Sequence, residues 1–300
     1  MFTAGRIAFA LVALVALDAS AREIKTHHFK TSTAISLSLT EKYSAGDEAA
    51  FKKNGKVVLL VHGATWSSKC TFDPAAGYSL MDALAEAGYD VWALDLHGYG
   101  KSDKSEQDWT EATAAAEDVD AAVDYIRSLR WVEKVNVLGY QWGTWPVGLF
   151  AQAHPKKVNK VVLFGIRHNT VERKGEPREQ YRQNTIQTAM LKPDDGDLDQ
   201  DFARRRANVC AQEDPQSPNG ALRDMTRRSP VDPAQITSPT MLIMGDRDAD
   251  PALTQDREQF FSALAAHDKW FVVLAGLGKF ANIERGRARF ENALISFLDL

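Results

Sequence analysis

Short apolar runs recur along the chain from residue 57 onwards, at intervals that leave room for a helix between them. Continuous apolar runs are typical of strands buried on both faces of a parallel sheet. An earlier segment alternates instead, with Ile35, Leu37 and Leu39 on one face, which predicts a half-exposed antiparallel strand. The continuous runs predict strands at 57–61, 91–94, 135–138, 161–164, 241–244 and 271–274.

Between these runs, apolar residues recur at helical spacing. The pattern predicts helices at 78–87, 111–129, 145–153, 251–266 and 285–298. Strands and helices that alternate in this way make an α/β fold, in which helices cover both faces of a mostly parallel central sheet.

One segment, from about residue 169 to 237, interrupts the alternation. It is rich in charged residues and proline, yet it keeps apolar residues along its length. Because a flexible loop needs no such anchors, we interpret the segment as a mainly helical cap inserted over the sheet. We therefore expect a single domain from residue 22 to 300 that includes this cap. The apolar anchors are Ile186, Met190, Leu191, Phe202, Val209 and Leu222.

The first 21 residues have the pattern of an export signal. An apolar run of 11 residues, from Ile7 to Leu17, follows Arg6, and Ala19-Ser20-Ala21 supplies small residues for cleavage. The run is too short to span a bilayer, which takes about 20 residues. We predict a secreted or periplasmic protein cleaved after Ala21, with an uncleaved N-terminal anchor as the alternative.

Export bears on the two cysteines, Cys70 and Cys210, because an oxidising compartment permits a disulfide between them. The distance between their Cα atoms decides whether a bridge can form. The sequence leaves both possibilities open, a disulfide or two separate buried thiols.

Composition narrows the choice of partners. The chain has 36 Lys and Arg against 40 Asp and Glu, a formal charge of −4, so it lacks the basic field that nucleic-acid binding requires. Its histidines and cysteines show no metal-ligand spacing. We therefore expect a monomer with a small-molecule ligand, and no nucleic acid, metal, organic cofactor or stable membrane insertion after cleavage.

Motifs with a chemical meaning follow the predicted strands. The carboxyl ends of parallel strands are where an open α/β sheet places its ligand site. The motifs are His62-Gly63-Ala64, Asp95–Asp103, Gly139-Tyr140-Gln141-Trp142-Gly143, Gly245-Asp246-Arg247-Asp248 and Gly276–Glu284.

Together these motifs resemble those of the α/β-hydrolase superfamily, and most closely its capped esterase, epoxide-hydrolase and C–C hydrolase branch. The resemblance extends from about residue 35 to 300. It implies a nucleophile elbow around residue 141, an acid at Asp248 and a histidine base at position 279. It also implies an oxyanion hole built from the backbone N–H groups of Ala64 and Trp142. We call His62-Gly63-Ala64 and the residues just after it the oxyanion loop. We expect His62 to brace this loop and not to act as a base.

Two of the three triad positions depart from the family pattern. Gln141 stands at the nucleophile position, and an amide has no ionisable nucleophilic oxygen or sulfur. Lys279 stands in place of the histidine, and an ordinary lysine, with a pKa of about 10.4, is protonated at neutral pH. A nearby Asp248 carboxylate favours that charged form. We therefore predict that the chain does not use the acyl-enzyme route.

Three functions remain open. The altered triad can form an inert hydrogen-bonded network, from Asp248 through Lys279 to Gln141, in a ligand-binding pseudoenzyme. The surviving backbone donors can instead serve a lyase, isomerase or cyclase that acts on a carbonyl-bearing substrate. The third possibility is an esterase-like hydrolase that uses water or another nucleophile. The candidate nucleophiles, none of them spaced from a base in a known pattern, are Ser67, Ser68, Cys70 and Thr144.

Aromatic residues cluster near the elbow and the oxyanion loop. Trp66, Tyr140 and Trp145 are candidate ligand contacts, and an aromatic lining favours an apolar or aromatic small molecule. Trp145 can equally pack the elbow helix into the core. Arg167 and His168 follow the strand at 161–164, where they can contact a ligand carboxylate or pair with the acidic cap.

Overall fold

The computed structural model describes residues 22–44, 50–52, 55–104, 109–169, 175–192, 196–248 and 251–300. The expected export signal, residues 1–21, lies outside these ranges, as do residues 170–174 and 193–195 of the expected cap. Among the described residues, no helix is long and apolar enough to cross a membrane.

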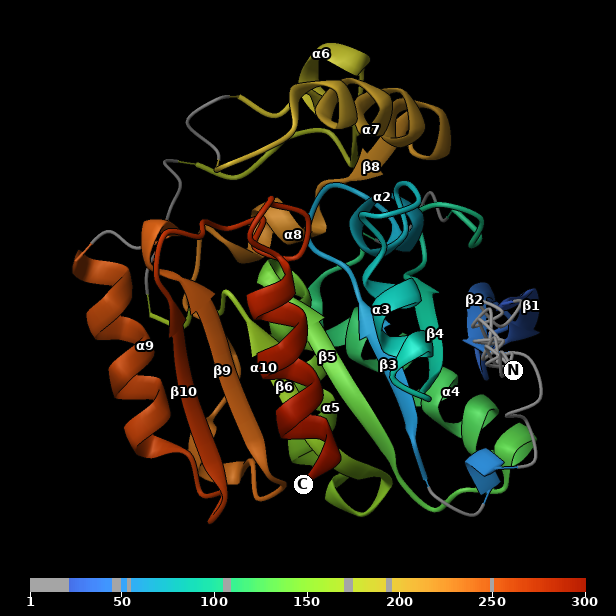
Figure 1. Cartoon of the computed structure of the whole chain (residues 1–300). Helices are drawn as coiled ribbons and strands as arrows, with labels where there is room; N and C mark the ends of the chain where they lie inside the picture. Colours follow the sequence, from blue (N-terminus) through green and yellow to red (C-terminus); the bar gives the residue numbers. More distant parts are fainter. Residues whose placement is uncertain are drawn as a thin grey trace, which may run out of the picture.

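An eight-stranded sheet forms the centre of the molecule (Figure 1). Strand β2 pairs antiparallel with both β1 and β4, and the remaining neighbours are parallel. The predicted mostly parallel α/β sheet is therefore confirmed. In spatial order the strands are β1 (Arg22–Lys30), β2 (Ser36–Ser44), β4 (Asp90–Asp95), β3 (Val57–Val61), β5 (Val135–Tyr140), β6 (Val158–Phe164), β9 (Thr240–Gly245) and β10 (Lys269–Leu274).

Helices cover both faces of this sheet (Figure 1). Successive residues of a strand point to opposite faces, so in β3 Leu59 lies in one core and Leu60 in the other. The core around Leu60 includes α3 (Leu80–Glu86) and α10 (Ala288–Asp299). The core around Leu59 includes α4 (Ala112–Arg130), α5 (Thr144–Ala153) and α9 (Pro251–Ala263).

The cap lies beyond the carboxyl ends of the central strands (Figure 1). Its helices agree with the expected mainly helical insertion, but it also contains a small antiparallel sheet. The cap elements are β7 (Tyr181–Gln183), α6 (Ile186–Ala189), α7 (Gln200–Glu213), β8 (Gln216–Pro218) and α8 (Gly220–Asp224). The 3₁₀ turn η4 (Pro233–Gln235) lies at the end of the expected cap segment. Outside the cap lie the short helix α2 (Ser68–Phe72) and the 3₁₀ turns η1 (Gln141–Gly143), η2 (Pro155–Lys157) and η5 (Asp246–Asp248).

A disulfide joins the cap to the core. Cys70 of α2 and Cys210 of α7 are bonded, with their Cα atoms 5.1 Å apart. Both are fully buried beside Ala189 and Ala207, and Trp66 packs against this group. Of the two arrangements that the sequence leaves open, the structure has the bridged one.

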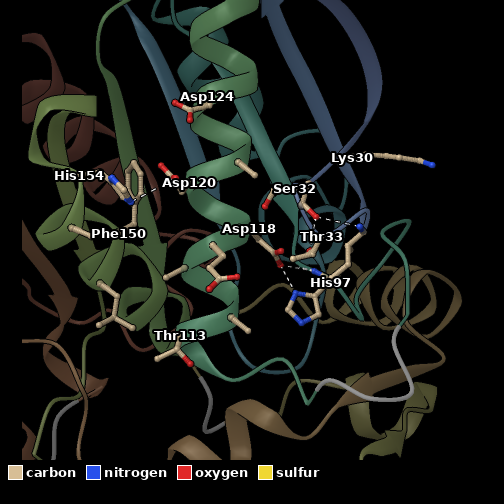
Figure 2. Close-up of a pocket in the computed structure, with 18 residues that line it drawn as sticks. Lys30, Ser32, Thr33, His97, Thr113, Asp118, Asp120, Asp124, Phe150 and His154 are labelled. Carbon is tan, nitrogen blue, oxygen red and sulfur yellow. Dashed lines mark hydrogen bonds and ion pairs between the residues drawn. The ribbon is translucent and has the colours of Figure 1, made fainter.

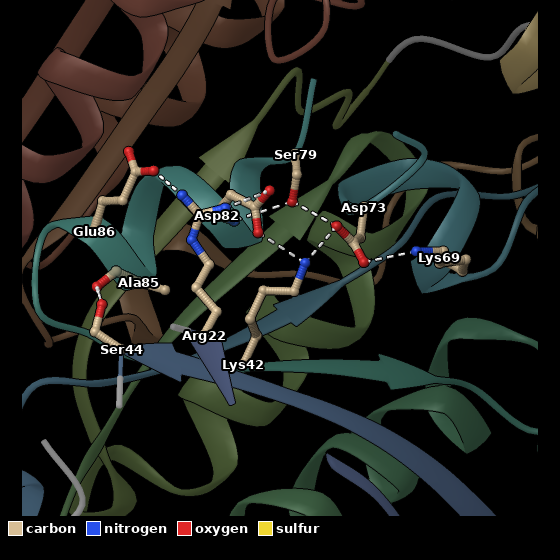
Figure 3. Close-up of polar contacts among 9 residues, drawn as sticks. All are labelled: Arg22, Lys42, Ser44, Lys69, Asp73, Ser79, Asp82, Ala85 and Glu86. Atoms are coloured by element: carbon tan, nitrogen blue, oxygen red, sulfur yellow. Dashed lines mark hydrogen bonds and ion pairs between the residues drawn. The ribbon is translucent and has the colours of Figure 1, made fainter. Parts of the chain in front are cut away.

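A buried ion-pair network holds the segment that contains α2 and α3 against β2 (Figure 3). Lys42 Nζ donates hydrogen bonds to Asp73 Oδ1 at 2.7 Å and to Asp82 Oδ1 at 2.8 Å. Burial alone would raise the pKa of Asp73, but hydrogen bonds from Lys42, Lys69 and Ser79 outweigh it and lower the pKa. The carboxylate of Asp73 therefore favours its ionised form. It helps to hold the segment that contains α2, and with it Cys70, against β2.

Candidate functional site

The residue at the nucleophile position lies on a sharp turn between β5 and α5. Gln141 has a φ of 48°, a left-handed conformation that costs a non-glycine residue about 1–2 kcal/mol. The turn also brings backbones very close together. A Cβ on Gly143 would overlap the carbonyl oxygen of His62, and a Cβ on Gly139 would overlap that of Gly143. The two glycines thus allow the elbow to form and to present Gln141.

A cavity of about 190 Å³ adjoins Gln141. Its lining includes five of the site residues expected from the sequence. It also includes Arg206, a cap residue of α7 that no sequence motif indicates. The expected residues that meet here are Ala64, Trp66, Tyr140, Gln141 and Lys279.

The side chains of Asp248 and Gln141 both approach the Cα of Gly165 from the same side. A Cβ placed on Gly165 would be 3.5 Å from Asp248 Oδ2 and 3.7 Å from Gln141 Cγ. Asp248 Oδ2 accepts a hydrogen bond from Arg257 Nη2 at 2.7 Å, a donor that no sequence motif indicates. Burial raises the pKa of Asp248, and the positive charges of Arg257, Arg167 and Lys279 oppose that rise.

Lys279 is presented by the loop that follows β10. Buried Glu284 holds this loop, because its Oε1 accepts a hydrogen bond from the N–H of Gly278 at 2.8 Å. The hydroxyl of Tyr140 donates to the carbonyl of Lys279 at 3.1 Å. Lys279 Nζ lies 4.9 Å from the ring centroid of Phe280. The backbone at Lys279 is therefore fixed to the elbow strand.

His62 braces the oxyanion loop. Its Nε2 accepts a hydrogen bond from the N–H of Leu96 at 3.2 Å, so the ring proton is on Nδ1, which donates to the carbonyl of Gly63 at 2.8 Å. Burial lowers the pKa of His62, which favours this neutral form. The carbonyl of Ala64 is held as well, by the hydroxyl of Tyr99 at 2.8 Å and by Arg182 Nη2 at 2.5 Å.

Two tryptophans of the elbow belong to the core. Trp145 is 2% exposed, and its indole N–H donates to the carbonyl of Arg167 at 2.6 Å. Trp142 is 3% exposed, and its indole N–H donates to Asp224 Oδ2 at 2.9 Å. Trp145 therefore packs the elbow helix into the core, which is one of the two roles that the sequence allows, and it does not line the cavity.

Arg167 and His168 lie on the loop after β6. Arg167 acts on Asp248 through its charge. The N–H of His168 donates to Asp256 Oδ2 at 2.7 Å, and its ring packs edge-on against Phe260 at 5.1 Å. Neither residue is part of the cavity lining, although the sequence offers both as ligand contacts.

The hydroxyl or thiol groups of three of the four alternative nucleophiles are engaged in other contacts. Ser68 Oγ donates to Asp95 Oδ1 at 2.5 Å, and Thr144 Oγ1 donates to the carbonyl of Gln141 at 2.5 Å. The sulfur of Cys70 is in the disulfide. Ser67 is fully buried, and its N–H donates to Asp214 Oδ2 at 2.7 Å. None of the four lines the cavity beside Gln141.

A larger cavity, of about 770 Å³, lies between the β1–β2 turn, α4 and the end of α5 (Figure 2). Three of its carboxylates take part in local ion pairs. Asp118 Oδ2 lies 2.6 Å from His97 Nδ1, and Lys157 Nζ donates to Asp120 at 2.6 Å and Asp124 at 2.8 Å. This cavity contains none of the residues at the triad positions.

Residues 56–295 match the protein family described as "alpha/beta hydrolase fold". The chain belongs to the α/β-hydrolase family. A 2-hydroxy-6-oxononadienedioate/2-hydroxy-6-oxononatrienedioate hydrolase of Paraburkholderia phymatum is 33% identical to this α/β-hydrolase over 111 residues, which are 37% of this chain and 36% of that relative. The enzyme of the same name from Escherichia coli K12 is 33% identical over 85 residues, 28% of each chain. The matches thus span about a third of these curated relatives or less.

Solved structures of several hydrolases share the fold of this chain over nearly its whole length. The crystal structure of E-2-(acetamidomethylene)succinate hydrolase has a TM-score of 0.66 at 18% identity, covering 93% of this chain and 100% of that one. Epoxide hydrolase A from Mycobacterium thermoresistibile has a TM-score of 0.63 at 21% identity, covering 92% and 98%. Identities this low establish a common fold and leave the activity open.

Proposed function

We propose that this α/β-hydrolase binds a small molecule in the cavity beside Gln141 and does not work through an acyl-enzyme. The observation that carries the proposal is a glutamine at the left-handed elbow position, next to the cavity. A primary amide offers no oxygen or sulfur that a base can activate for attack. The hydroxyl and thiol groups of Ser68, Cys70 and Thr144 are engaged elsewhere, which supports the same conclusion.

The change at the base position supports the proposal independently. General base catalysis needs a group that can accept a proton at the working pH. An ammonium group cannot accept one, and the carboxylate of Asp248 lies close enough to Lys279 for their charges to interact. Serine-type turnover would therefore lack its base as well as its nucleophile.

A non-hydrolytic lyase or isomerase is the second candidate. The observation that favours it is that Lys279 lines the same cavity as Gln141. An ammonium group positioned in a small cavity can polarise a substrate carbonyl, and electrostatic stabilisation of this kind is often the largest catalytic contribution. Turnover of a bound ligand, lost in Lys279→Ala, would distinguish this function from simple binding.

The test restores the family triad by combining Gln141→Ser with Lys279→His. We expect the wild type neither to hydrolyse p-nitrophenyl acetate above the uncatalysed rate nor to react with a fluorophosphonate at a serine. The double variant should do both, whereas Gln141→Ser alone should hydrolyse more slowly because it lacks the base. A wild type that is labelled at a serine and turns the ester over would overturn the proposal.

We also propose that the protein is exported. The buried Cys70–Cys210 disulfide supports this, because disulfides persist in oxidising compartments. N-terminal sequencing of the protein expressed from its full sequence should give Arg22 as the first residue, and a mature chain that retains residues 1–21 would contradict the expected cleavage.

A further inference from the structure

The cavity beside Gln141 is lined by more positive than negative side chains. Among the described residues that line it, two carry a positive charge, Lys279 from the loop after β10 and Arg206 from the cap helix α7, and none carries a negative charge. We propose that this cavity binds the carboxylate of a small organic acid between Lys279 and Arg206. The inference rests on the proposed function, because it requires a cavity used for binding and not for acyl transfer.

Arg206 is built into the site by the packing of α7. Arg206 is only 3% exposed, and its Nη1 donates to the carbonyl of Ala189 at 3.4 Å. One turn further along α7, Cys210 is bonded to the core. One turn before it, the ring of Phe202 stacks on that of Tyr78 with 3.8 Å between the centroids. These contacts hold α7 on both sides of Arg206, and burial restricts its guanidinium, so binding an anion costs little additional side-chain entropy.

The two cations lie over the same aromatic ring. Lys279 Nζ is 4.9 Å from the ring centroid of Phe280, and Arg206 Cζ is 5.9 Å from it. Like charges repel more strongly in a poorly hydrated cavity than in water. Both side chains line the cavity, so a carboxylate bound there would offset this repulsion by two attractions, through charge-assisted hydrogen bonds that are roughly twice as strong as neutral ones.

The rest of the lining limits the size and shape of the acid. Trp66, Tyr140 and Phe280 provide aromatic surface, and the amide of Gln141 provides one more donor and one more acceptor. The volume of about 190 Å³ is below the roughly 300–1,000 Å³ of pockets for drug-sized ligands. The ligand class is therefore a small carboxylate with a short or flat apolar body.

Isothermal titration calorimetry with benzoate, and with its neutral counterpart benzamide, tests the proposal. At constant ionic strength we expect the wild type to bind benzoate at least about tenfold more tightly than benzamide, because hydrogen bonds to charged groups contribute more than neutral ones. Lys279→Gln and Arg206→Gln should each weaken benzoate binding about tenfold and leave benzamide binding unchanged. Arg204→Gln is the matched control, since Arg204 lies on the outer face of α7 with its side chain 67% exposed.

Circular dichroism melting of each variant separates loss of binding from loss of folding. Arg206→Lys keeps a positive charge in the cavity, so it should retain most of the preference for benzoate even where Arg206→Gln does not fold. Equal affinities for benzoate and benzamide, no benzoate binding by the wild type, or full benzoate affinity in both glutamine variants would overturn the proposal. Serine labelling of the wild type by a fluorophosphonate would instead overturn the proposed function, so the two failures are distinguishable.

Discussion

At the scale of single residues, Asp224 is the buried carboxylate that ties the elbow to the base of the cap. Its Oδ2 accepts hydrogen bonds from the indole N–H of Trp142 at 2.9 Å and from the N–H of Ala112 at 2.7 Å. Burial raises the pKa of Asp224 to about 6, although both hydrogen bonds favour the ionised form. Desolvation is thus the stronger effect at this position.

The raised pKa of Asp224 predicts that the stability of the fold depends on pH. Because the folded-state pKa of about 6 exceeds the ordinary value of 3.8, the folded protein holds this proton more tightly than the unfolded chain. The free energy of unfolding therefore falls as the pH rises from about 4 to 7, by about 2 kcal/mol from this group alone. Asp224→Asn keeps an oxygen for both donors but removes the titrating group. In urea denaturation, the free energy of unfolding of this variant should therefore fall between pH 4 and 7 by about 2 kcal/mol less than that of the wild type.

Two comparisons complete this experiment. Asp224→Ala loses both hydrogen bonds and should be less stable than Asp224→Asn at every pH, because two buried donors lose their acceptor. Wild type and Asp224→Asn curves that run parallel from pH 4 to 7 would show that Asp224 does not titrate in this range.

At the scale of elements, the strand–turn–helix formed by β5, η1 and α5 depends on Gly143. A methyl group there would overlap the carbonyl oxygen of His62, so α5 or the oxyanion loop would have to move. We expect Gly143→Ala to lower the free energy of unfolding by about 3 kcal/mol, measured by urea denaturation. Gly88→Ala is the control, since Gly88 has a φ of 82° but open space around it, and it should cost only about 1 kcal/mol. Equal losses would argue against a steric role for Gly143.

The sequence predicted the strands in which every residue is buried. All five residues of β3 are buried, so an apolar run of the same length marks the strand. The sequence did not predict β1, because its side chains are exposed or half-exposed and include charged residues throughout. The cap strands β7 and β8 have three residues each, too few to show an alternation.

The site was predictable only where a motif marks it. The elbow and the loop after β10 have motifs, so Gln141 and Lys279 were found, and both line the cavity. Arg206 has no motif, because its place in the cavity depends on how α7 packs against a loop more than 70 residues away. Trp145 lies near the elbow in sequence, but only the packing of α5 decides that it belongs to the core.

At the scale of the whole molecule, the cap is attached to the oxyanion loop and its neighbours at several points. Asp214, at the end of α7, accepts hydrogen bonds from the N–H groups of Ser67 at 2.7 Å and Gly100 at 2.8 Å. Arg182 of β7 donates to the carbonyl of Ala64 at 2.5 Å. Together with the disulfide, these contacts make the position of Arg206 a property of the whole cap–core junction.

The disulfide is the covalent part of this junction, and its removal should affect both stability and binding. It joins residues 140 positions apart, and closing a loop of this length restricts the unfolded chain by about 4–5 kcal/mol. We expect Cys70→Ala with Cys210→Ala to lower the free energy of unfolding by up to this amount. The same variant should bind benzoate more weakly, because α7 then holds Arg206 less firmly over the cavity.

Two measurements show whether the bridge acts on binding through Arg206. Dithiothreitol should weaken benzoate binding by the wild type, in titration calorimetry, and should have no effect on the double alanine variant. In an Arg206→Gln background, removal of the disulfide should cause little further loss, since residues that act through one another give non-additive effects. A further loss as large as in the wild-type background would show that the bridge supports the cavity by a route independent of Arg206.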